Sequence, residues 1–407
     1  MIETDVVVIG GGPGGYAAAF AAADHGMQVT LVNLDKNPGG VCLYKGCIPS
    51  KALLHIAKLV NETEEASHWG LEYQKPVIHL DKMRAWKDSV IAKMTGGLGV
   101  LTKQRKVNYV QGYASFADSY TLNIKKSDGT EDQLKFNKAI IAIGSIITTI
   151  PSLMINSPRL LNSTTALELP EIPGSMLVIG GGYIGLELGS VYSALGTKVS
   201  VVEMTSGLLP GADRDLVQHL QKRVEAKFDK IMLSTKVQKL EDVGNGIKVA
   251  MQDKDGKDFD VTYDYVLMSI GRRPSVEGLG LENTKVTTTP RGHIVVDPQR
   301  RTLDDHIYAI GDIAGDPMLA HKANHEAHIA VAAIAGSKAI YEPRAIPAVV
   351  FTDPEIAWAG ITETEAQAQG VEYEVGKFPW AASGRATTLG RNDGLTKVIV
   401  DPKTERI

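Results

Sequence analysis

Cysteine is scarce in this chain of 407 residues, since only Cys42 and Cys47 occur. A disulfide-stabilised secreted scaffold needs more cysteines than two, so the pair is expected to do chemistry rather than to hold the fold together. No uninterrupted run of about 18 apolar residues is present, and no membrane span is predicted. The N-terminus lacks the positive charge that begins a secretory signal, and we therefore expect a cytoplasmic protein.

An excess of basic charge is also missing. The formal net charge is −4, so nucleic acid is not expected as a partner. Hydrophobic residues make up 43% of the chain and charged residues 22%, which is typical of a globular protein. The chain is too long for one ordinary core, so several domains are expected. The 41 glycines gather at strand–helix turns and provide the first positive signal.

Two segments repeat one pattern of apolar strand, glycine turn, helix and second strand. This order is a βαβ unit of the kind that binds dinucleotides. The predicted strands and helices are Val6–Ile9, Tyr16–His25 and Gln28–Asn33 in the first segment, and Ser175–Ile179, Leu186–Leu195 and Lys198–Glu203 in the second. The G-x-G-x-x-G period falls at Gly10, Gly12 and Gly15, and again at Gly180, Gly182 and Gly185.

Each glycine of this period has a physical task. The first allows a tight turn, the second lets a pyrophosphate approach the backbone, and the third permits close packing of helix and strand. The helix N-terminus then faces the phosphate charge. Two copies in this context predict two bound dinucleotides and an α/β fold with two Rossmann-like domains.

The residue that ends each second strand is expected to contact a ribose. Glu203 offers a carboxylate that accepts hydrogen bonds from free hydroxyls and repels a 2′-phosphate, so NAD is favoured over NADP. In the first unit the corresponding residue is Asn33, with Asp35 two positions further on. Asn33 can bind a ribose hydroxyl but brings no charge.

The rest of the chain predicts an α/β framework around these units. The predicted helices pack against sheets, and hairpin turns are expected at residues 127–129 and 253–257. The further predicted helices are Lys51–His68, Leu80–Gln104 and Thr362–Gln369, and the further strands are Ala139–Ile143, Tyr265–Ile270, His306–Ile310 and Leu395–Val400.

The segment from Gly40 to Lys51 contains both cysteines and is the most specific in the sequence. A disulfide between Cys42 and Cys47 closes a very short loop and adds little stability, which favours a bond that opens and closes. A helix is predicted to start directly after Cys47, where its dipole and Lys51 would stabilise a thiolate. Zinc would need two further ligands, so no metal site is predicted. Two unrelated buried thiols remain the alternative.

With these motifs the whole chain resembles the class I pyridine nucleotide–disulfide oxidoreductases, and within them the dihydrolipoyl dehydrogenases. The resemblance is carried by Gly39–Lys51, Gly180–Gly189, Leu208–Asp215, Gly271–Pro274, Gly311–Asp312 and Phe351–Gly360. It implies an FAD-binding domain over 1–147, an NAD-binding domain over 148–275, a second part of the FAD-binding or central domain over 276–345, and an incomplete α+β interface domain over 346–407.

The resemblance also assigns roles. Cys47 would face the flavin and Cys42 would exchange with substrate, while Lys51 and Glu187 would pair near the flavin. Asp312 would hold the ribityl chain of FAD, and an N-cap of the helix that follows is its alternative role. By the resemblance Gly10–Gly15 would bind FAD, and Gly180–Gly185 with Glu203 would bind NAD. The full set of implied cofactor-binding residues is Gly10, Gly12, Pro13, Gly14, Gly15, Asn33, Gly40, Lys51, Gly144, Gly180, Gly182, Tyr183, Ile184, Gly185, Glu203, Gly271, Asp312 and Ala320.

Three positions depart from the family pattern. Asn33 stands where the family usually has glutamate, and Ile143 replaces the threonine of the usual Ala-Thr-Gly turn. Tyr183 lies in the second glycine turn, where it either gates the nicotinamide pocket or simply covers the helix start.

The end of the sequence prompts a further expectation. The family's interface domain supplies a His–Glu acid–base pair from its last segment, which we expect to be missing here. Leu395–Val400 would then lack its expected hairpin partner. His321, His325 and His328 are not expected to replace the pair, and they are predicted to pack near the flavin or to face solvent.

The resemblance implies an enzyme that oxidises protein-bound dihydrolipoyl groups, with electrons passing through Cys42 and Cys47 and FAD to NAD. Its partners would be a lipoyl-bearing acyltransferase or a glycine-cleavage carrier protein, and the full-length protein would be a homodimer. Another reductase of the class, similar to mercuric or glutathione reductase, is the alternative. A flavin-binding fragment that does not turn over lipoamide is a second alternative.

Overall fold

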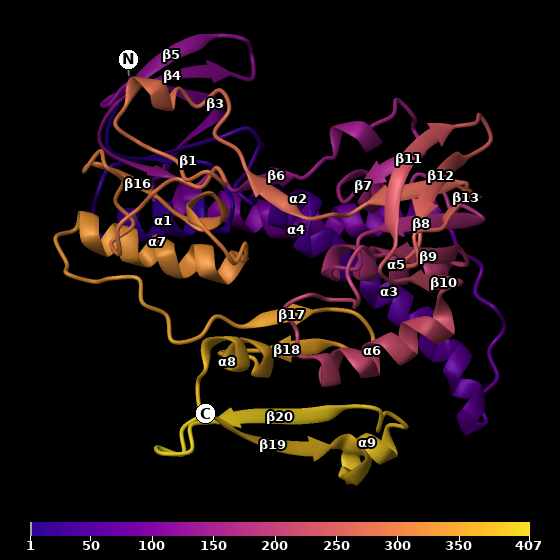
Figure 1. The fold of residues 1–407 in the computed structure, drawn as a ribbon. Helices are drawn as coiled ribbons and strands as arrows, with labels where there is room; N and C mark the ends of the chain where they lie inside the picture. The colour runs from indigo at the N-terminus through magenta and orange to yellow at the C-terminus, as the bar shows by residue number, and fades with distance from the viewer. Residues whose placement is uncertain (1) are drawn as a thin grey trace. The chain divides into compact units, whose positions relative to one another are not determined.

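The computed structural model describes residues 2–407, which form two compact units built from several stretches of chain (Figure 1). The first unit comprises residues up to Pro49, Asp81–Thr148 and Arg272–Pro343. The second comprises Ser50–Leu80, Thr149–Gly271 and Arg344–Ile407. Each βαβ pattern of the sequence therefore lies in a unit of its own.

The first unit is built on a largely parallel sheet. Strands β3, β2, β1, β5 and β16 are hydrogen-bonded in that order and run parallel, and β4 joins β3 to β5 in antiparallel fashion. A short antiparallel pair, β6 and β15, completes the unit. The strands are β1 (Ile2–Ile9), β2 (Val29–Asn33), β3 (Asn108–Asp118), β4 (Thr121–Lys126), β5 (Glu131–Ile141), β6 (Ser145–Ile147), β15 (Arg272–Pro274) and β16 (Ile307–Ala309).

Both faces of this sheet are buried, as near-continuous apolar strands predict. Helices α1 (Pro13–Asp24) and α7 (Ala320–Ile334) cover one face and pack on each other through alanines (Figure 1). The other face packs against the β3–β4–β5 meander and the segment around Leu279–Ile294. Because small alanines line α1 and α7, the helices can approach the strands closely, and the glycine turn between β1 and α1 is held rigidly.

The second unit has a five-stranded parallel sheet in the order β10-β9-β8-β14-β7. One face carries the antiparallel sheet β11-β12-β13, and the two sheets enclose an apolar core. These elements are β7 (Leu160–Asn162), β8 (Ser175–Ile179), α5 (Tyr183–Leu195), β9 (Lys198–Val202), α6 (Arg214–Lys227), β10 (Lys230–Met232), β11 (Lys236–Asp242), β12 (Ile247–Gln252), β13 (Asp258–Tyr263) and β14 (Tyr265–Met268).

The C-terminal part of the second unit consists of two antiparallel strand pairs and short helices. Its elements are β17 (Ala348–Val350), β18 (Ile356–Trp358), α8 (Glu363–Gln369), β19 (Glu374–Pro379), α9 (Gly384–Thr388) and β20 (Leu395–Val400). Strand β20 pairs with β19 along its whole length. The expectation concerned a hairpin partner that follows this strand; the partner that the structure shows is the preceding strand, and β19 and β20 form a two-stranded sheet.

The predicted helices between the glycine units are present with small boundary changes. Helix α3 spans Cys47–Glu65, so Cys47 is its first residue; the start was predicted directly after Cys47, with Lys51–His68 as the rough range of the helix body. Helix α4 spans Leu80–Gln104, as predicted, and the short helix α2 spans Gly40–Lys45.

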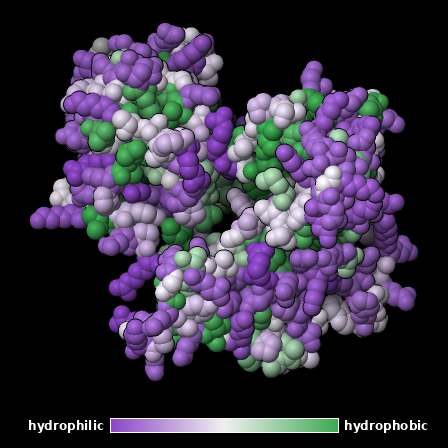
Figure 2. Space-filling view, in the orientation of Figure 1, coloured by the Kyte–Doolittle hydropathy of each residue, from purple (hydrophilic) through white to green (hydrophobic). Residues whose placement is uncertain are grey.

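The surface of the described chain is mainly polar. On the face shown in Figure 2, hydrophilic residues predominate and hydrophobic residues form small patches among them. Among residues 2–407, no helix is both long and apolar enough to cross a membrane.

Candidate active site

The first glycine turn connects β1 to α1 and has no room for side chains at two positions. Gly10 adopts φ +103°, and a methyl group there would lie 2.4 Å from the carbonyl oxygen of Ala142. A methyl group at Gly15 would lie 1.8 Å from the carbonyl oxygen of Gly10. Glycine is required at both positions because backbone atoms, which cannot move aside, occupy the space.

The second glycine turn, between β8 and α5, repeats this geometry. Gly180 adopts φ +106°, and a methyl group there would lie 2.6 Å from the carbonyl oxygen of Ser269. At Gly185 a methyl group would lie 2.4 Å from the carbonyl oxygen of Gly180. Both turns therefore have the close helix–strand packing that the sequence pattern predicts.

The middle glycines of the two turns have the opposite environment. Around Gly12 and Gly182, no described atom lies within 4 Å of the position that a Cβ would occupy. Both residues are helix N-caps, and within the described chain neither α1 nor α5 has a side-chain cap hydrogen bond. The positive end of each helix dipole therefore lies at a glycine with open space on its Cβ side, which suits the close approach of a pyrophosphate.

The residues that end the second strands hold the glycine turns in place. Glu203 accepts hydrogen bonds from the amide groups of Gly181 (2.7 Å) and Thr205 (2.7 Å). Asn33 accepts one from Gly11 (3.0 Å) through Oδ1. Both side chains thus reach the turn where a ribose would be bound, and both keep lone pairs that could accept hydroxyl hydrogen bonds.

Asn33 is oriented by two neighbours in the first unit. Its Nδ2 donates to the hydroxyl of Tyr109 (3.2 Å) and to Asp35 Oδ2 (3.4 Å), and the Tyr109 hydroxyl donates to the carbonyl oxygen of Asp35 (2.7 Å). Burial raises the pKa of Tyr109 to about 12, so this phenol stays a donor over the physiological range. The negative charge missing from Asn33 is supplied next to it by Asp35.

The two cysteines follow directly on a second contact with the first glycine turn. The amide of Gly39 donates to the carbonyl oxygen of Gly11 (2.7 Å). Gly40 adopts φ +59°, and a methyl group there would lie 2.5 Å from Gly12 Cα. Helix α2, which contains Cys42, starts at this contact. The glycine turn and the cysteine pair are therefore parts of one continuous backbone arrangement.

Cys42 is half-buried in α2, and Cys47 is exposed as the first residue of α3. The positive end of the α3 helix dipole lies at Cys47, which favours a thiolate there. Tyr16, in the first turns of α1, lies near both sulfur atoms. Burial, followed by the negative charges of Cys42 and Cys47, raises the pKa of the Tyr16 phenol.

Lys51 and Glu187 form an ion pair in the second unit. Lys51 Nζ lies 3.0 Å from Glu187 Oε2 and 3.2 Å from Oε1. Only 4% of the Glu187 side chain is exposed, and its Oε1 also accepts the amide of Phe351 (3.0 Å). The Lys51 ammonium lies 4.2 Å from the centre of the Phe351 ring. The predicted pair is thus formed, and Phe351, to which the sequence assigned no role of its own, fixes it.

Asp312 lies in a short turn of 3₁₀ helix that follows β16. Its Oδ2 accepts the hydroxyl of Ser145 (2.5 Å), and Ser145 Oγ accepts Arg272 Nε (2.8 Å). Leu319 is the N-cap of α7, so Asp312 does not cap the helix that follows. The carboxylate is half-buried and keeps acceptor capacity for a hydroxyl-bearing ligand.

The comparisons with known proteins decide the family. The family model for pyridine nucleotide-disulphide oxidoreductases matches residues 4–327, and the model for their dimerisation domain matches residues 346–407. This chain belongs to the pyridine nucleotide-disulphide oxidoreductase family. Members of this family use FAD and NAD(H), and the chain is accordingly a flavin-dependent oxidoreductase.

Several relatives are similar over the whole chain. Dihydrolipoyl dehydrogenase of Haemophilus influenzae is 49% identical over 406 residues, covering 100% of this chain and 84% of that protein. Dihydrolipoyl dehydrogenase of Vibrio cholerae is 46% identical, covering 100% and 85%. The crystal structure of LpdA from Mycobacterium tuberculosis matches with a TM-score of 0.90 at 27% identity, covering 99% of this chain and 88% of that one.

The flavoprotein disulfide reductase RclA from Escherichia coli is a second structural neighbour. In its Cu(II) complex it matches with a TM-score of 0.88 at 27% identity, covering 100% of this chain and 88% of that one. The α/β fold with Rossmann-like units and a dimerisation domain, predicted from the sequence, is confirmed by these matches.

The remaining residues that the family resemblance singled out are at turns and helix starts. In the first unit, Pro13 and Gly14 lie in the first turn of α1, Gly144 (φ +73°) precedes β6, and Ala320 is the first residue of α7. In the second unit, Tyr183 and Ile184 open α5. Gly271 (φ +108°) lies between β14 and β15 at the end of the second unit.

The sequence left the role of some side chains open. Tyr183 is exposed at the start of α5, which agrees with both roles that the sequence allowed. His321, His325 and His328 are all exposed along α7, as one of the two predicted placements requires.

The sequence assigned no role to the residues that orient the site residues. They are Tyr16, Tyr109, Ser145, Leu209, Arg272 and Phe351. Leu209, Arg272 and Phe351 lie in segments that carry the family resemblance, but their contacts join residues far apart in the chain, as do those of Tyr109 and Asn33, which are 76 positions apart. The pairing of β2 with β3, which places Tyr109 opposite Leu31, would have been the signal.

Proposed function

We propose that this chain is a dihydrolipoyl dehydrogenase, which oxidises protein-bound dihydrolipoyl groups and passes the electrons to NAD. The observation that carries this proposal is the continuity between the first glycine turn and the cysteine pair. Gly39 binds Gly11, Gly40 packs on Gly12, and Cys42 follows in the next helical turn. A redox disulfide so anchored would lie beside whatever dinucleotide the turn binds.

In this proposal the first unit binds FAD and the second binds NAD. Bound FAD supplies a two-electron acceptor for the dithiol and a hydride donor for NAD. The open N-terminus of α1, Asn33 with Asp35, and Asp312 would hold the pyrophosphate, ribose and ribityl parts of FAD. The open N-terminus of α5 and Glu203 would hold NAD.

The cysteines divide the thiol chemistry between them. A dihydrolipoyl thiolate attacks Cys42 Sγ of the oxidised pair, so that a mixed disulfide forms and Cys47 leaves as a thiolate. The second dihydrolipoyl sulfur, as a thiolate, then attacks the lipoyl sulfur bound to Cys42. This closes the lipoyl disulfide and leaves both cysteines reduced. The two electrons taken from the substrate now reside in the dithiol.

Charged groups near the start of α3 support the thiolate. Cys47 is the first residue of the helix and Lys51 follows one turn later. Glu187 and the Phe351 ring fix the Lys51 ammonium, so its position does not depend on the flexible lysine chain. A fixed positive charge favours the ionised form of a nearby thiol.

The partners follow from the same proposal. The segment 346–407, which matches the dimerisation domain, would pair two copies of the chain as a homodimer. The substrates would be lipoyl groups on an acyltransferase or on a glycine-cleavage carrier protein in the cytoplasm. Glu203 favours NAD, since a 2′-phosphate would lie against its carboxylate.

An anaerobic titration with NADH tests the proposal. The FAD-loaded protein should develop the long-wavelength absorbance of a thiolate–flavin charge-transfer complex. Cys47→Ser should abolish this band, whereas Cys42→Ser should show it without added NADH, because Cys47 can then form no disulfide and stays a thiolate. Absence of the band in FAD-loaded wild-type protein would overturn the proposal.

Turnover assays separate the substrate from the cofactor chemistry. NADH-dependent reduction of lipoamide should exceed NADPH-dependent reduction by two orders of magnitude or more, because Glu203 disfavours the 2′-phosphate. If the protein reduces an electron-accepting dye with NADH but does not reduce lipoamide, the flavin chemistry of the proposal holds and its lipoyl substrate is contradicted.

A further inference from the structure

The loop from Met204 to Asp213 closes over the second glycine turn. The amide of Leu209 donates to the carbonyl oxygen of Gly181 (2.9 Å), while Glu203 accepts the amide of the same residue. Leu208 is fully buried, and a methyl group at Gly181 would lie 2.7 Å from its Cδ2 atom. The Gly181 peptide is therefore held on both sides, and its position depends on this loop.

Arg214 gives the loop its shape. Its guanidinium donates to the carbonyl oxygens of Leu208 (2.7 Å), Leu209 (2.5 Å) and Ala212 (2.6 Å). Leu209 adopts φ +48°, a conformation that a leucine rarely takes without support from its surroundings. Since one side chain binds three loop carbonyls, the loop moves as a unit with the start of α6.

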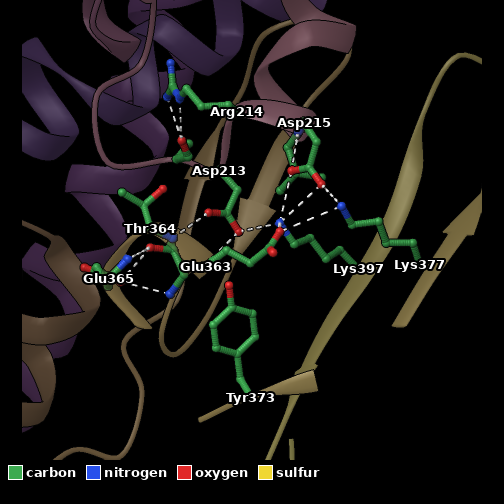
Figure 3. Close-up of polar contacts among 12 residues, drawn as sticks. Asp213, Arg214, Asp215, Glu363, Thr364, Glu365, Tyr373, Lys377 and Lys397 are labelled. Atoms are coloured by element: carbon green, nitrogen blue, oxygen red, sulfur yellow. Dashed lines mark hydrogen bonds and ion pairs between the residues drawn. The ribbon is translucent and has the colours of Figure 1, made fainter. Parts of the chain in front are cut away.

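The start of α6 is tied to the C-terminal strands by a buried lysine (Figure 3). Lys397 of β20 has a side chain that is 4% exposed, and its ammonium contacts Asp213 (2.9 Å), Asp215 (3.1 Å) and Glu363. Lys377 of β19 adds a second contact to Asp215 (2.8 Å). The two strands of the C-terminal hairpin thus hold the acidic residues on both sides of Arg214.

Asp213 also binds the start of α8. Its carboxylate accepts the amide groups of Glu363 (3.2 Å) and Thr364 (3.4 Å). Burial lowers the pKa of Lys397, but the hydrogen bonds that its ammonium donates to Glu363, Asp213 and Asp215 outweigh it and raise the pKa above that of a free lysine. Without this positive charge the carboxylates that surround it would repel one another.

We propose that Lys397 is a positioning residue for the pyridine-nucleotide site, acting through Asp213, Asp215 and the Met204–Asp213 loop on the Gly181 turn. The inference rests on the proposed function, which assigns NAD to this turn. The C-terminal hairpin is then a part of the nucleotide site, although it does not line the turn. Loss of Lys397 releases the loop, and the Gly181 peptide loses the support of its carbonyl side.

The test measures binding of NADH to FAD-loaded protein by calorimetry and binding of FAD to the apoprotein by fluorescence quenching. For Lys397→Met we expect the Kd for NADH to rise about tenfold, with FAD binding unchanged, because the Gly11 turn has its own support from Gly39. Lys397→Arg keeps the positive charge and should recover most of the affinity. Lys403→Met is the matched control, since Lys403 pairs with Glu372 at an exposed site of the same segment.

A second variant covers the case in which Lys397→Met does not fold. Arg214→Met removes the loop contacts while Lys397 and its carboxylates stay in place, and it should weaken NADH binding by a similar factor. Wild-type affinity for NADH in either folded variant would overturn the inference, and so would an equal loss of FAD binding. A wild-type protein that binds FAD but no NADH at any concentration would instead contradict the proposed function.

Discussion

The two glycine turns of this chain hold their middle residue in the same way. In the first, Gly11 donates its amide to Asn33 and accepts the amide of Gly39 at its carbonyl oxygen. In the second, Gly181 donates to Glu203 and accepts from Leu209. Gly39 and Leu209 lie the same number of residues after the strand-ending side chain. The same backbone arrangement therefore occurs at two sites whose strand-ending side chains differ.

The turns differ in what is attached to the segment that closes them. In the first unit Gly39 leads within three residues to Cys42, so the covalent chain itself places the redox pair beside the turn. In the second unit Leu209 leads to the acidic cluster at the start of α6, and side-chain charges tie the turn to β20. A covalent link tolerates changes of pH and salt. A link made of charges does not, and this difference can be tested.

The largest effect is expected at Gly15, where an added methyl group would make the shortest contact in either glycine turn. Gly15→Ala would place a methyl group 1.8 Å from a backbone oxygen, against 2.4 Å for Gly185→Ala. We expect Gly15→Ala to lower the free energy of unfolding by about 3 kcal/mol or more and to abolish FAD binding, because backbone cannot yield. Gly185→Ala should be milder and should affect NADH binding alone. Chemical unfolding and cofactor titration measure both.

Gly12→Ala and Gly182→Ala are the controls for this pair, since no described atom lies near the added methyl group at either position. Both should fold with wild-type stability and lose affinity for their own nucleotide only. Equal stability of Gly15→Ala and Gly12→Ala would contradict the packing argument.

Acid should separate the two units. Burial alone would raise the pKa of Asp213 and Asp215, but their ion pairs with lysines outweigh this effect and lower both pKa values. Arg391 and Arg223 likewise lower the pKa of Asp353 against the effect of burial. A carboxylate whose pKa is lower in the folded than in the unfolded protein stabilises the fold fully when the pH is above its pKa in the unfolded protein, about 3.9. This contribution is lost as the pH falls through its pKa in the folded protein. The second unit, which contains all three, should therefore open first below about pH 4.

A hydrogen-exchange pulse at fixed pH, applied after incubation between pH 7 and pH 3, measures this order. Peptides from β8, β9 and β20 should lose protection at a higher pH than peptides from β1 and β5. Simultaneous loss in both units would mean that the ion pairs around Lys397 and Asp353 contribute no measurable stability.

The sequence was sufficient for the parts of the fold that local rules determine. Both βαβ units, α4 and the cysteine pair at a helix start were predicted, because apolar periodicity and glycine spacing are local signals. The Lys51–Glu187 pair came from the family resemblance and is present in the structure. The helix start directly after Cys47 was predicted to within one residue, because Pro49 suits a first turn.

The contacts that orient the site could not be predicted in this way. Tyr109 reaches Asn33 because β3 pairs with β2, and Lys397 reaches Asp213 because β20 lies near α6 in the folded unit. Both are side-chain contacts over long sequence separations, and one sequence carries no signal for them. Strand β19, which pairs with β20, was not predicted for a different reason, since its residues 374–379 include a glycine and a proline and lack a clear apolar alternation.

A smaller effect is expected when Glu203 of the second turn is replaced by an amide side chain, like that of Asn33 in the first. Glu203→Gln leaves one carbonyl oxygen where two carboxylate oxygens accept the amides of Gly181 and Thr205. One amide then faces an NH₂ group, and about 1–2 kcal/mol of NADH binding should be lost. Calorimetry should show a Kd raised about 5- to 30-fold, with NADPH weakened less than NADH. If NADPH binding weakens as much, Glu203 does not select between the two.

The smallest effect is expected at Tyr109, which supports Asn33 in the first turn. Tyr109→Phe removes the hydroxyl that donates to the Asp35 carbonyl (2.7 Å) and accepts Asn33 Nδ2 (3.2 Å), and it should lower the free energy of unfolding at pH 8 by about 1 kcal/mol. Burial raises the pKa of Tyr109 to about 12 in the folded protein. The phenol therefore contributes fully to the free energy of unfolding below its pKa in the unfolded protein, about 10, and this contribution is lost as the pH rises towards 12. Urea unfolding of the FAD-free protein should show the difference in free energy of unfolding between wild type and variant closing from pH 8 to pH 11.

Tyr113→Phe is the control, at an exposed phenol of the same strand that donates to the carbonyl oxygen of Glu277, and it should show no such closure. A constant gap for Tyr109→Phe would mean that Asn33 is held by Gly11 and Asp35 alone.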